Sequence, residues 1–400
     1  MSRRTLTLIL GFIAFIALGL PDALLGLAWP FMRTAIEQPL EASGLIVLSG
    51  TLGAALSGFF SSWLGRHLGI GRLLALSCAL TGIALIGYAL APSLGVILIC
   101  AIIIGIAAGA TDATVNGYVA KNFGDRLMQW LHASFGVGIT IGPVVMTLIL
   151  AQQLSWQLGY TIHAGLQLIL ALLFFVTAGI WLAGKKSSAT PHQDKHAADH
   201  HDTTMLRSLT DIRIWLAMAS FFFYCGLEYS VGLWTFSLLT ENRGVSTAQA
   251  GLWVSIYWGM FTVGRMVMGT IAHKLAPTRM IVFGLISAAL GTALFAISTD
   301  VYINLLAIII IGFAYAPLYP AMVSTTLRRV GIEHFNNAMG LQVTGASLGI
   351  ALLPGLIGWI AAHTSLTLYP WLLLAITAIL VLVSWTAHRL PVSRDSSKAQ

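Results

Sequence analysis

Twelve long apolar runs, separated by short polar breaks, divide the chain. A helix needs roughly 20 apolar residues to cross a bilayer, and each run is long enough to do so. Because lipid offers the backbone no hydrogen-bond partner, each run is predicted to be a helix. The expected spans are residues 5–32, 43–64, 72–91, 94–120, 127–150, 160–183, 212–239, 249–272, 279–298, 301–326, 335–361 and 365–388. The pattern therefore predicts an all-α membrane protein with twelve transmembrane helices.

The two halves of the chain repeat at an offset of about 207 residues. Gly44-Leu45 corresponds to Gly251-Leu252, and Ile104-Gly105 to Ile311-Gly312. The first span carries Asp22-x3-Gly26-Leu27-x-Trp29, and the seventh carries Glu228-x3-Gly232-Leu233-Trp234. Repeats of this kind are typical of transporters whose substrate site lies between two similar halves. We therefore expect two pseudo-symmetric six-helix bundles.

A hydrophilic segment, residues 184–211, separates the first six spans from the last six. It contains His192, His196, His200 and His201, whose spacing could hold a metal ion. A flexible charged linker is the simpler interpretation, because no Cys or pair of acidic residues accompanies the histidines. We predict no metal site and three parts: a bundle at 1–183, the His-rich linker at 184–211, and a bundle at 212–400 with a short cytoplasmic tail.

The composition excludes a water-soluble protein, because 57% of the 400 residues are apolar and only 9% are charged. Soluble domains carry about 25% charged residues. The mean hydropathy is +0.86. Eighteen of the 21 Lys and Arg residues fall in the termini and in the loops on one side of the predicted spans, against only Arg33 and Arg243 on the other side. The positive-inside rule predicts that both termini are cytoplasmic, and it explains the net charge of +7 without a nucleic-acid partner.

Three of the fourteen acidic residues lie within apolar spans: Asp22, Asp112 and Glu228. A charged side chain at the centre of a membrane helix costs roughly 2.5–3.5 kcal/mol on insertion scales, so such residues are candidates for function. Asp112 and Asn116 are four residues apart and share a helix face with Gly105 and Gly109. Burial disfavours the charged carboxylate, so Asp112 is a candidate proton carrier. A structural hydrogen bond between helices is the alternative.

The other two acids lie in the spans that correspond between the halves. Asp22 follows Pro21 and precedes Pro30, which predicts an interrupted helix of the kind that forms transporter sites; a polar group reaching the interface is the alternative. Glu228 has aromatic neighbours such as Trp234, a combination that suits the hydroxyl groups and C–H face of a sugar. It could equally be a structural partner of Arg265.

Further polar and aromatic residues in the spans complete the set of candidates. Arg265 is too deep to reach the interface easily, so it either pairs with an acid or binds an anionic substrate. His132 could relay protons or be an ordinary residue at a helix end. Tyr257, Trp258, Tyr319 and Gln342 could line a pocket or serve in packing. The repeat places Tyr257 and Trp258 opposite Gly50 and Thr51, so the second half is the bulkier one.

Several of these stretches together resemble the fucose permease-like branch of the major facilitator superfamily. The resemblance covers the chain apart from the tails and residues 184–211. It rests on Asp22-x3-Gly26-x2-Trp29-Pro30, Gly105-x6-Asp112-x3-Asn116, His132-x2-Phe135-Gly136-x-Gly138, Gly226-Leu-Glu228, Trp253-Val-Ser-x2-Trp258-Gly-x4-Gly264-Arg265 and Gly312-x4-Pro317-Leu-Tyr319-Pro320. The resemblance implies proton-coupled sugar uptake. It also implies that an acid on helix 1 and an acid followed by Asn on helix 4 serve proton and sugar, positions that match Asp22, Asp112 and Asn116.

The sequence departs from the superfamily pattern at two places. Arg66 stands where the loop between helices 2 and 3 usually has an acid, so the gating salt bridge of that loop is in doubt. On helix 5, Gly138-x3-Gly142-Pro143 is part of an antiporter signature, but Val145 and Met146 replace its final glycine pair. This difference weakens an interpretation as a drug exporter.

Together these features predict a secondary active transporter of a bacterial cytoplasmic membrane. We expect it to act as a monomer that moves a monosaccharide with protons by alternating access, with no cofactor and no nucleic-acid partner. An enzyme is not expected, because no metal cluster, phosphate loop or nucleophile–base set occurs in the sequence. Three alternatives stay open: coupling to sodium, proton-coupled export of drugs or organic anions, and a membrane sensor that does not transport.

Overall fold

The structure, a computed structural model, describes residues 2–123, 125–182, 205–271 and 275–390. Within these ranges, the side chains at 58–63, 66, 120, 121, 125, 126, 129 and 336 are not described. The described residues form helices and no strands. The helices are α1 (Arg3–Gly19), α2 (Leu24–Ala35), α3 (Ala42–Leu68), α4 (Ile70–Leu90), α5 (Leu94–Asn122), α6 (Asp125–Ala151), α7 (Trp156–Val176), α8 (Ala178–Leu182), α9 (Met205–Ser208), α10 (Ile212–Ser237), η2 (Leu238–Asn242), α11 (Thr247–Ile271), α12 (Pro277–Ile297), α13 (Val301–Tyr315), α14 (Leu318–Val330), η3 (Ile332–His334), α15 (Phe335–His363), η4 (Leu366–Leu368) and α16 (Tyr369–Arg389).

The twelve predicted spans correspond to these helices. Ten are long and apolar enough to cross a membrane. The other two are α3, whose described apolar part is Ala42–Ser57, and α11, a continuous helix of 25 residues. The all-α transmembrane fold is therefore confirmed, and the chain is a multi-pass membrane protein.

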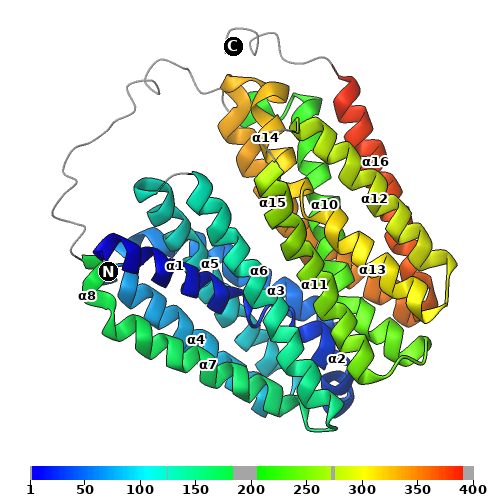
Figure 1. Ribbon diagram of the computed structural model, residues 1–400, viewed down its shortest axis with the longest axis horizontal. Coiled ribbons are helices and arrows are strands. Elements are labelled where there is room, and N and C mark those ends of the chain that lie inside the picture. Colours follow the sequence, from blue (N-terminus) through cyan, green and yellow to red (C-terminus); the bar gives the residue numbers. More distant parts are fainter. Residues whose placement is uncertain (1, 124, 183–204, 272–274, 391–400) are drawn as a thin grey trace.

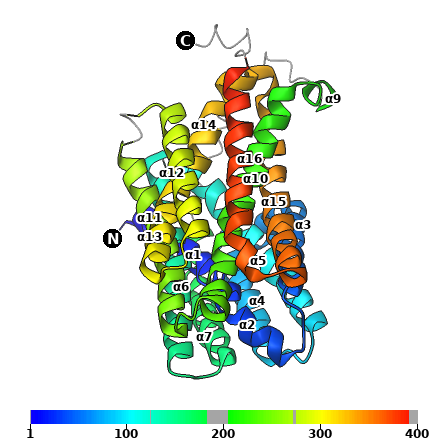
Figure 2. The ribbon, with the colours of Figure 1, turned by 90° about the vertical axis from the view of Figure 1, so that its right-hand side faces the viewer.

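The helices form two bundles, one from each half of the chain. Helices α1–α8 make the first bundle and α10–α16 the second (Figure 1). In the second bundle, α16 and α10 run side by side along its length (Figure 2). Residues 184–204 of the predicted linker, which include its four histidines, lie outside the described residues. The predicted division of the chain therefore stays a prediction.

Close helix contacts repeat between the bundles as the sequence offset predicts. A Cβ atom on Gly105 would meet the backbone of Gly50, and one on Gly312 would meet the backbone of Tyr257. These pairs join α5 to α3 and α13 to α11, which are the equivalent helices of each half. Gly105 and Gly109 thus make room for a partner helix. The pseudo-symmetry of the two bundles is therefore visible in backbone contacts and not only in residue types.

The first predicted span is interrupted at residues 20–23, between α1 and α2. Pro21 lies in this break and has no N–H to continue the helix. The break is held against α6, because Gly138 and Gly142 let α6 approach the backbone of Ile16 and Leu20. This contact explains the glycine spacing on α6. It also places Asp22, in the break, at the centre of the molecule.

The two ends of the molecule differ in how the bundles meet. We call the end where α1 begins and α16 ends the basic end, and the opposite end, where α2 ends and η2 lies, the far end. At the far end, Arg33 Nη2 and Glu241 Oε2 form an ion pair of 2.9 Å between the bundles. A Cβ atom on Gly26 would meet the backbone of Gly232 there. The bundles diverge toward the basic end (Figure 1).

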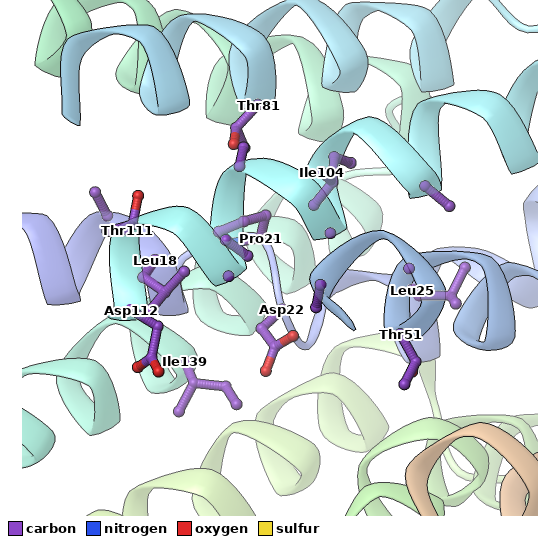
Figure 3. A pocket seen from close by; sticks show the side chains of 18 of the residues that line it. Leu18, Pro21, Asp22, Leu25, Thr51, Thr81, Ile104, Thr111, Asp112 and Ile139 are labelled. Atoms are coloured by element: carbon purple, nitrogen blue, oxygen red, sulfur yellow. The ribbon is translucent and has the colours of Figure 1, made fainter. Parts of the chain in front are cut away.

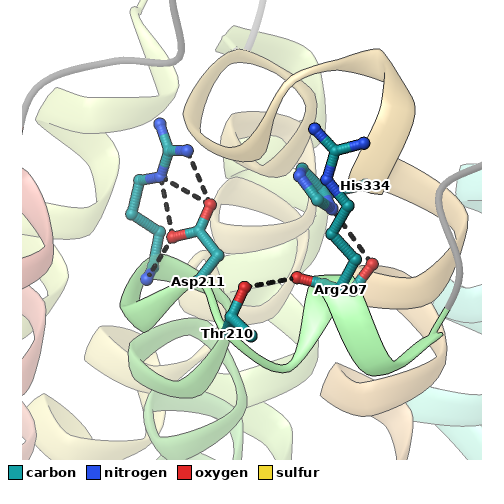
Figure 4. Close-up of polar contacts among 6 residues, drawn as sticks. Arg207, Thr210, Asp211 and His334 are labelled. Carbon is teal, nitrogen blue, oxygen red and sulfur yellow. Dashed lines mark hydrogen bonds and ion pairs between the residues drawn. The ribbon is translucent and has the colours of Figure 1, made fainter.

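The second bundle begins with a set of polar contacts at the basic end. Asp211 caps α10 and accepts hydrogen bonds from the backbone and guanidinium of Arg213, with Nη2 2.6 Å from Oδ2 (Figure 4). Ser208 on α9 lies 3.0 Å from Nδ1 of His334 and accepts a hydrogen bond from Asn337. These contacts attach the segment before α10 to η3 and α15.

Candidate functional site

A cavity of about 510 Å³ lies between the two bundles, a volume typical of small-molecule sites. Most of its lining comes from the first bundle: α1, the break at residues 20–23, and helices α2 to α7. The second bundle contributes Glu228, Tyr229, Trp258, Ser347 and Ile350. At the far end, the Arg33–Glu241 ion pair and the close approach of Gly26 to Gly232 join the bundles.

Asp22 and Asp112 both face this cavity. Asp22 lies in the break between α1 and α2, and Asp112 lies on α5; both side chains are exposed to the cavity. Figure 3 shows the two carboxylates pointing to the same side, with Ile139 between them. Two of the three acids predicted from the sequence therefore meet in one space although they are 90 residues apart in the chain.

Glu228 is the third acid that lines the cavity, and it comes from the second bundle. It lies on α10, is half-buried, and is close enough to Asp22 for their charges to interact. Trp258 on α11 lines the same cavity and is 3% exposed, with its indole packed against Gly232. No described residue accepts a hydrogen bond from the indole N–H. The two bundles thus each present at least one carboxylate to a shared space.

Asn116 supports Asp112 and is not part of the cavity wall. Its Nδ2 donates to Oδ1 of Asp112 at 3.0 Å, which fixes the direction of the carboxylate. The Oδ1 atom of Asn116 is buried and has no hydrogen-bond partner within the described part of the chain. The i, i+4 spacing read from the sequence is therefore a direct hydrogen bond in the structure. The predicted role of Asn116 in binding substrate stays a prediction.

Trp234 and Tyr257 lie one layer behind the cavity. Trp234 is fully buried, and its indole N–H donates to the backbone oxygen of Pro354 at 2.9 Å. The Tyr257 hydroxyl donates to the backbone oxygen of Glu228 at 2.9 Å. Neither side chain is part of the cavity lining. Both hold α10 in position, and Tyr257 does so at the residue that carries the carboxylate.

Tyr319 and Gln342 are also not among the lining residues of the central cavity. The Tyr319 ring packs edge-on against Phe221, with ring centroids 5.0 Å apart. Gln342 is buried and exchanges hydrogen bonds with the Thr326 hydroxyl. Gln342 lines only a separate void of about 20 Å³ inside the second bundle. The structure gives these two residues packing contacts within their own bundle.

His132 and Arg265 lie near the cavity on the basic side, one from each bundle. His132 packs edge-on against Phe15 with centroids 5.6 Å apart, and Arg265 lies over the Phe261 ring at 4.2 Å. Within the described part of the chain, Arg265 forms no ion pair with an acid. It is close enough to interact electrostatically with His132 and with Glu228. The predicted direct pairing of Arg265 with an acid is not seen among the described residues and stays a prediction.

Arg66, the departure from the superfamily pattern, lies in α3, but its side chain is outside the described part of the chain.

The cavity wall also contains polar residues that the sequence reasoning did not single out, among them Tyr88, Tyr160, Gln167 and Tyr229. Gln167 is committed to the fold, because its Nε2 donates to the backbone oxygen of Ala17 at 2.6 Å. Tyrosine in an apolar span is ordinarily a packing residue, so composition alone does not separate the three cavity tyrosines from the other tyrosines of the chain. Only Tyr229 could have been suspected from the sequence, because it directly follows Glu228.

The described lining of the cavity contains acidic and no basic side chains: Asp22, Asp112 and Glu228 face it, and none of its described lining residues is Lys, Arg or His. Threonine, serine and tyrosine hydroxyls supply further hydrogen-bonding groups, among them Thr51, Thr81 and Thr111. A cavity with hydroxyls, aromatic rings and carboxylates suits neutral hydroxyl-bearing or cationic ligands, and it repels anions.

Comparison with known proteins agrees with this architecture. The sequence matches the family described as Major Facilitator Superfamily over residues 7–331 and 216–400. It is 24% identical to the mouse protein named sodium-dependent glucose transporter 1A, covering 96% of this chain and 98% of that protein. It is 21% identical to the glucose/mannose transporter GlcP of Bacillus subtilis, covering 96% and 95%.

Solved structures show the same fold at lower identity. The crystal structure of a bacterial homolog to the human lysosomal transporter Spinster, inward-facing and unoccupied, has a TM-score of 0.78 and 12% identity, covering 97% of this chain and 98% of that chain. The structure of the nucleoside transporter NupG has a TM-score of 0.74 and 15% identity, covering 97% and 98%.

Proposed function

Because the chain belongs to the major facilitator superfamily, a family of membrane transport proteins and not of enzymes, we propose that it is a monosaccharide transporter coupled to protons. One observation carries the proposal: Asp22 and Asp112 from the first bundle and Glu228 from the second face one central cavity. A site shared by two bundles can be offered to either side of the membrane when the bundles rock. The protein is therefore a symporter that acts as a monomer by alternating access.

The proposed substrate class rests on the chemistry of the cavity. Carboxylates accept hydrogen bonds from sugar hydroxyls, and aromatic faces pack on the C–H face of the ring. Relatives named for glucose and mannose support the same class. Export of organic anions is disfavoured, because the described lining offers three acids and no cation.

The proposed coupling ion is the proton. In a membrane cavity, a carboxyl group that has no counter-ion favours its neutral, protonated form. Binding and release of a proton can therefore accompany the switch of the cavity from one side of the membrane to the other. Asp22 and Asp112 carry this role because both are open to the cavity. Several relatives are named sodium-dependent, which makes sodium the competing coupling ion.

We assign the basic end to the cytoplasm. Most described Lys and Arg residues lie there, and positive charge accumulates on the cytoplasmic side of membrane proteins. The protein is then an inward-facing transporter of a bacterial cytoplasmic membrane, with both termini inside.

A transport assay tests these assignments together. Purified protein in liposomes is given D-glucose, D-mannose or D-galactose with an imposed pH gradient, or with an imposed sodium gradient at constant pH. We expect accumulation with the pH gradient only. Accumulation driven by sodium alone overturns proton coupling but keeps sugar transport. Absence of any sugar flux, with binding retained, supports the sensor instead.

A further inference from the structure

Three tyrosines from three helices line the cavity: Tyr88 on α4, Tyr160 on α7 and Tyr229 on α10. We call these three residues the tyrosine arm. Thr81 on α4 also lines the cavity (Figure 3).

The tyrosine arm is rigid around Tyr160. The rings of Tyr88 and Tyr160 meet edge to face with centroids 5.3 Å apart, and Trp156 packs on Tyr160 at 6.0 Å. Tyr160 is 1% exposed. A side chain held on two sides by rings offers its hydroxyl group in one place, so little ordering is needed when a ligand binds.

The hydroxyl group of Tyr160 is buried, and among the described residues it has no hydrogen-bond partner. Leaving such a group unpaired is unfavourable, and most buried hydroxyls in proteins are paired. Tyr160 lies close enough to Tyr229 and Tyr88 for their hydroxyls to interact, and Tyr229 is close to Asp22. The unpaired hydroxyl therefore belongs to a polar group that continues from the carboxylate of Asp22 into the arm.

Resting on the proposed function, we propose that the tyrosine arm is a specificity subsite that receives one hydroxyl-bearing end of a neutral monosaccharide, with Tyr160 hydrogen-bonding to a single sugar hydroxyl. Phenol groups both donate and accept hydrogen bonds, as a sugar hydroxyl requires, and the ring edges form apolar walls around it. Asp22, which lines the same cavity, repels an anionic group. The arm is built largely by the first bundle, so the sugar end in it stays with that bundle during transport.

The test uses Tyr160→Phe, which removes only the hydroxyl group and keeps the ring contacts. Tyr118→Phe is the matched control, because its hydroxyl bonds to Thr7 away from the cavity. Equilibrium binding of D-glucose and of its monodeoxy analogues, one for each hydroxyl, is measured by calorimetry on the purified full-length variants. Tyr88→Phe serves as a second variant if Tyr160→Phe does not fold.

We expect Tyr160→Phe to weaken D-glucose binding about two- to tenfold, as loss of one neutral hydrogen bond does. One monodeoxy analogue should bind wild type and Tyr160→Phe equally, because that analogue lacks the same hydrogen bond, and Tyr118→Phe should resemble wild type. Unchanged D-glucose affinity in Tyr160→Phe, or equal weakening for every analogue, overturns the subsite and leaves sugar binding intact. If wild type binds none of the sugars, the proposed function fails and the subsite with it.

Discussion

Arg33 and Glu241 connect the two bundles at the far end through an ion pair of 2.9 Å, and both side chains remain partly exposed. Exposed pairs contribute roughly 0–1 kcal/mol, so this contact biases the conformational equilibrium without locking it. We expect Arg33→Gln to raise the far-end-open population by a factor of about two to five. Electron–electron distance measurements between spin labels at Thr34 and Asn242 would show a larger long-distance fraction. The exchanged pair Arg33→Glu with Glu241→Arg should restore the wild-type distribution, and failure to do so would exclude direct pairing.

Gly26 tests the same closure through backbone packing. A Cβ atom there would meet the backbone of Gly232 across the bundle interface, and backbone cannot move aside as a flexible side chain can. We expect Gly26→Ala to disfavour the far-end-closed state by about 1–3 kcal/mol, the usual cost of overpacking. Gly165→Ala is the control, because a Cβ atom at Gly165 has open space. The spin-label distances between Thr34 and Asn242 measure this effect as well. Identical distance distributions in Gly26→Ala and Gly165→Ala would contradict the prediction.

Asp112→Asn should separate transport from coupling. Asparagine keeps the shape and the hydrogen bond to Asn116 but cannot carry a proton. In liposomes we expect no accumulation of D-glucose under a pH gradient, while exchange of preloaded sugar continues in part. Asp300→Asn is the control, since it caps α13 away from the cavity and asparagine is also a good helix cap. Concentrative uptake by Asp112→Asn would show that Asp112 is not the coupling residue.

Glu228→Gln should act on affinity. Hydrogen bonds to a charged group are worth about 1.5–3 kcal/mol, so we expect D-glucose binding to weaken roughly 10- to 150-fold. The Tyr257 hydroxyl bonds to the backbone of Glu228 and not to its carboxylate, so the local fold is expected to survive. Calorimetry on the purified variant measures the effect, with circular dichroism as the folding control. Wild-type affinity in a folded variant would remove Glu228 from the sugar site.

Asp211 and Arg213 give a pH dependence of stability outside the membrane. Burial raises the pKa of Asp211, but hydrogen bonds and charge from Arg213 outweigh burial and hold the pKa below its ordinary value. Because the pKa of Asp211 is lower in the folded state, the ionised carboxylate stabilises the folded protein at pH values above its ordinary pKa of about 3.9. This stabilisation is lost as the pH falls through the pKa of the folded state. The melting temperature of wild type should therefore exceed that of Asp211→Asn at neutral pH, with the gap shrinking below about pH 4. A gap that stays constant with pH would contradict the assignment.

The spans were predictable because each one is a long apolar run, and their ends agree with the helices to within a few residues in most cases. The break in the first helix was also predictable, since Pro21 stands in an apolar span beside Asp22. The sequence pointed to Asp22, Asp112 and Glu228 less directly, through the free-energy cost of placing a carboxylate in lipid. All three line the cavity.

The rest of the site depends on how each helix is rotated about its axis, which an apolar span does not reveal. In such a span every face is apolar, so periodicity does not separate Trp258, which lines the cavity, from Tyr257, which lies behind it. Trp234 and Gln342 are turned into their own bundle for the same reason. Tyr88 and Tyr160 line the cavity although their spans are equally apolar on every face.

Equivalent positions carry small residues in the first bundle and large residues in the second, and this difference bears on how the substrate preference of such a protein can change. Gly50 and Thr51 on α3 leave space where Tyr257 and Trp258 on α11 fill it, and most of the residues that line the cavity come from the first bundle. The first half of the chain then determines substrate preference, and the second half supplies the opposing wall of the cavity. A chimera that receives the first bundle of a relative should acquire the cargo of that relative while keeping the opposing wall of its own second half.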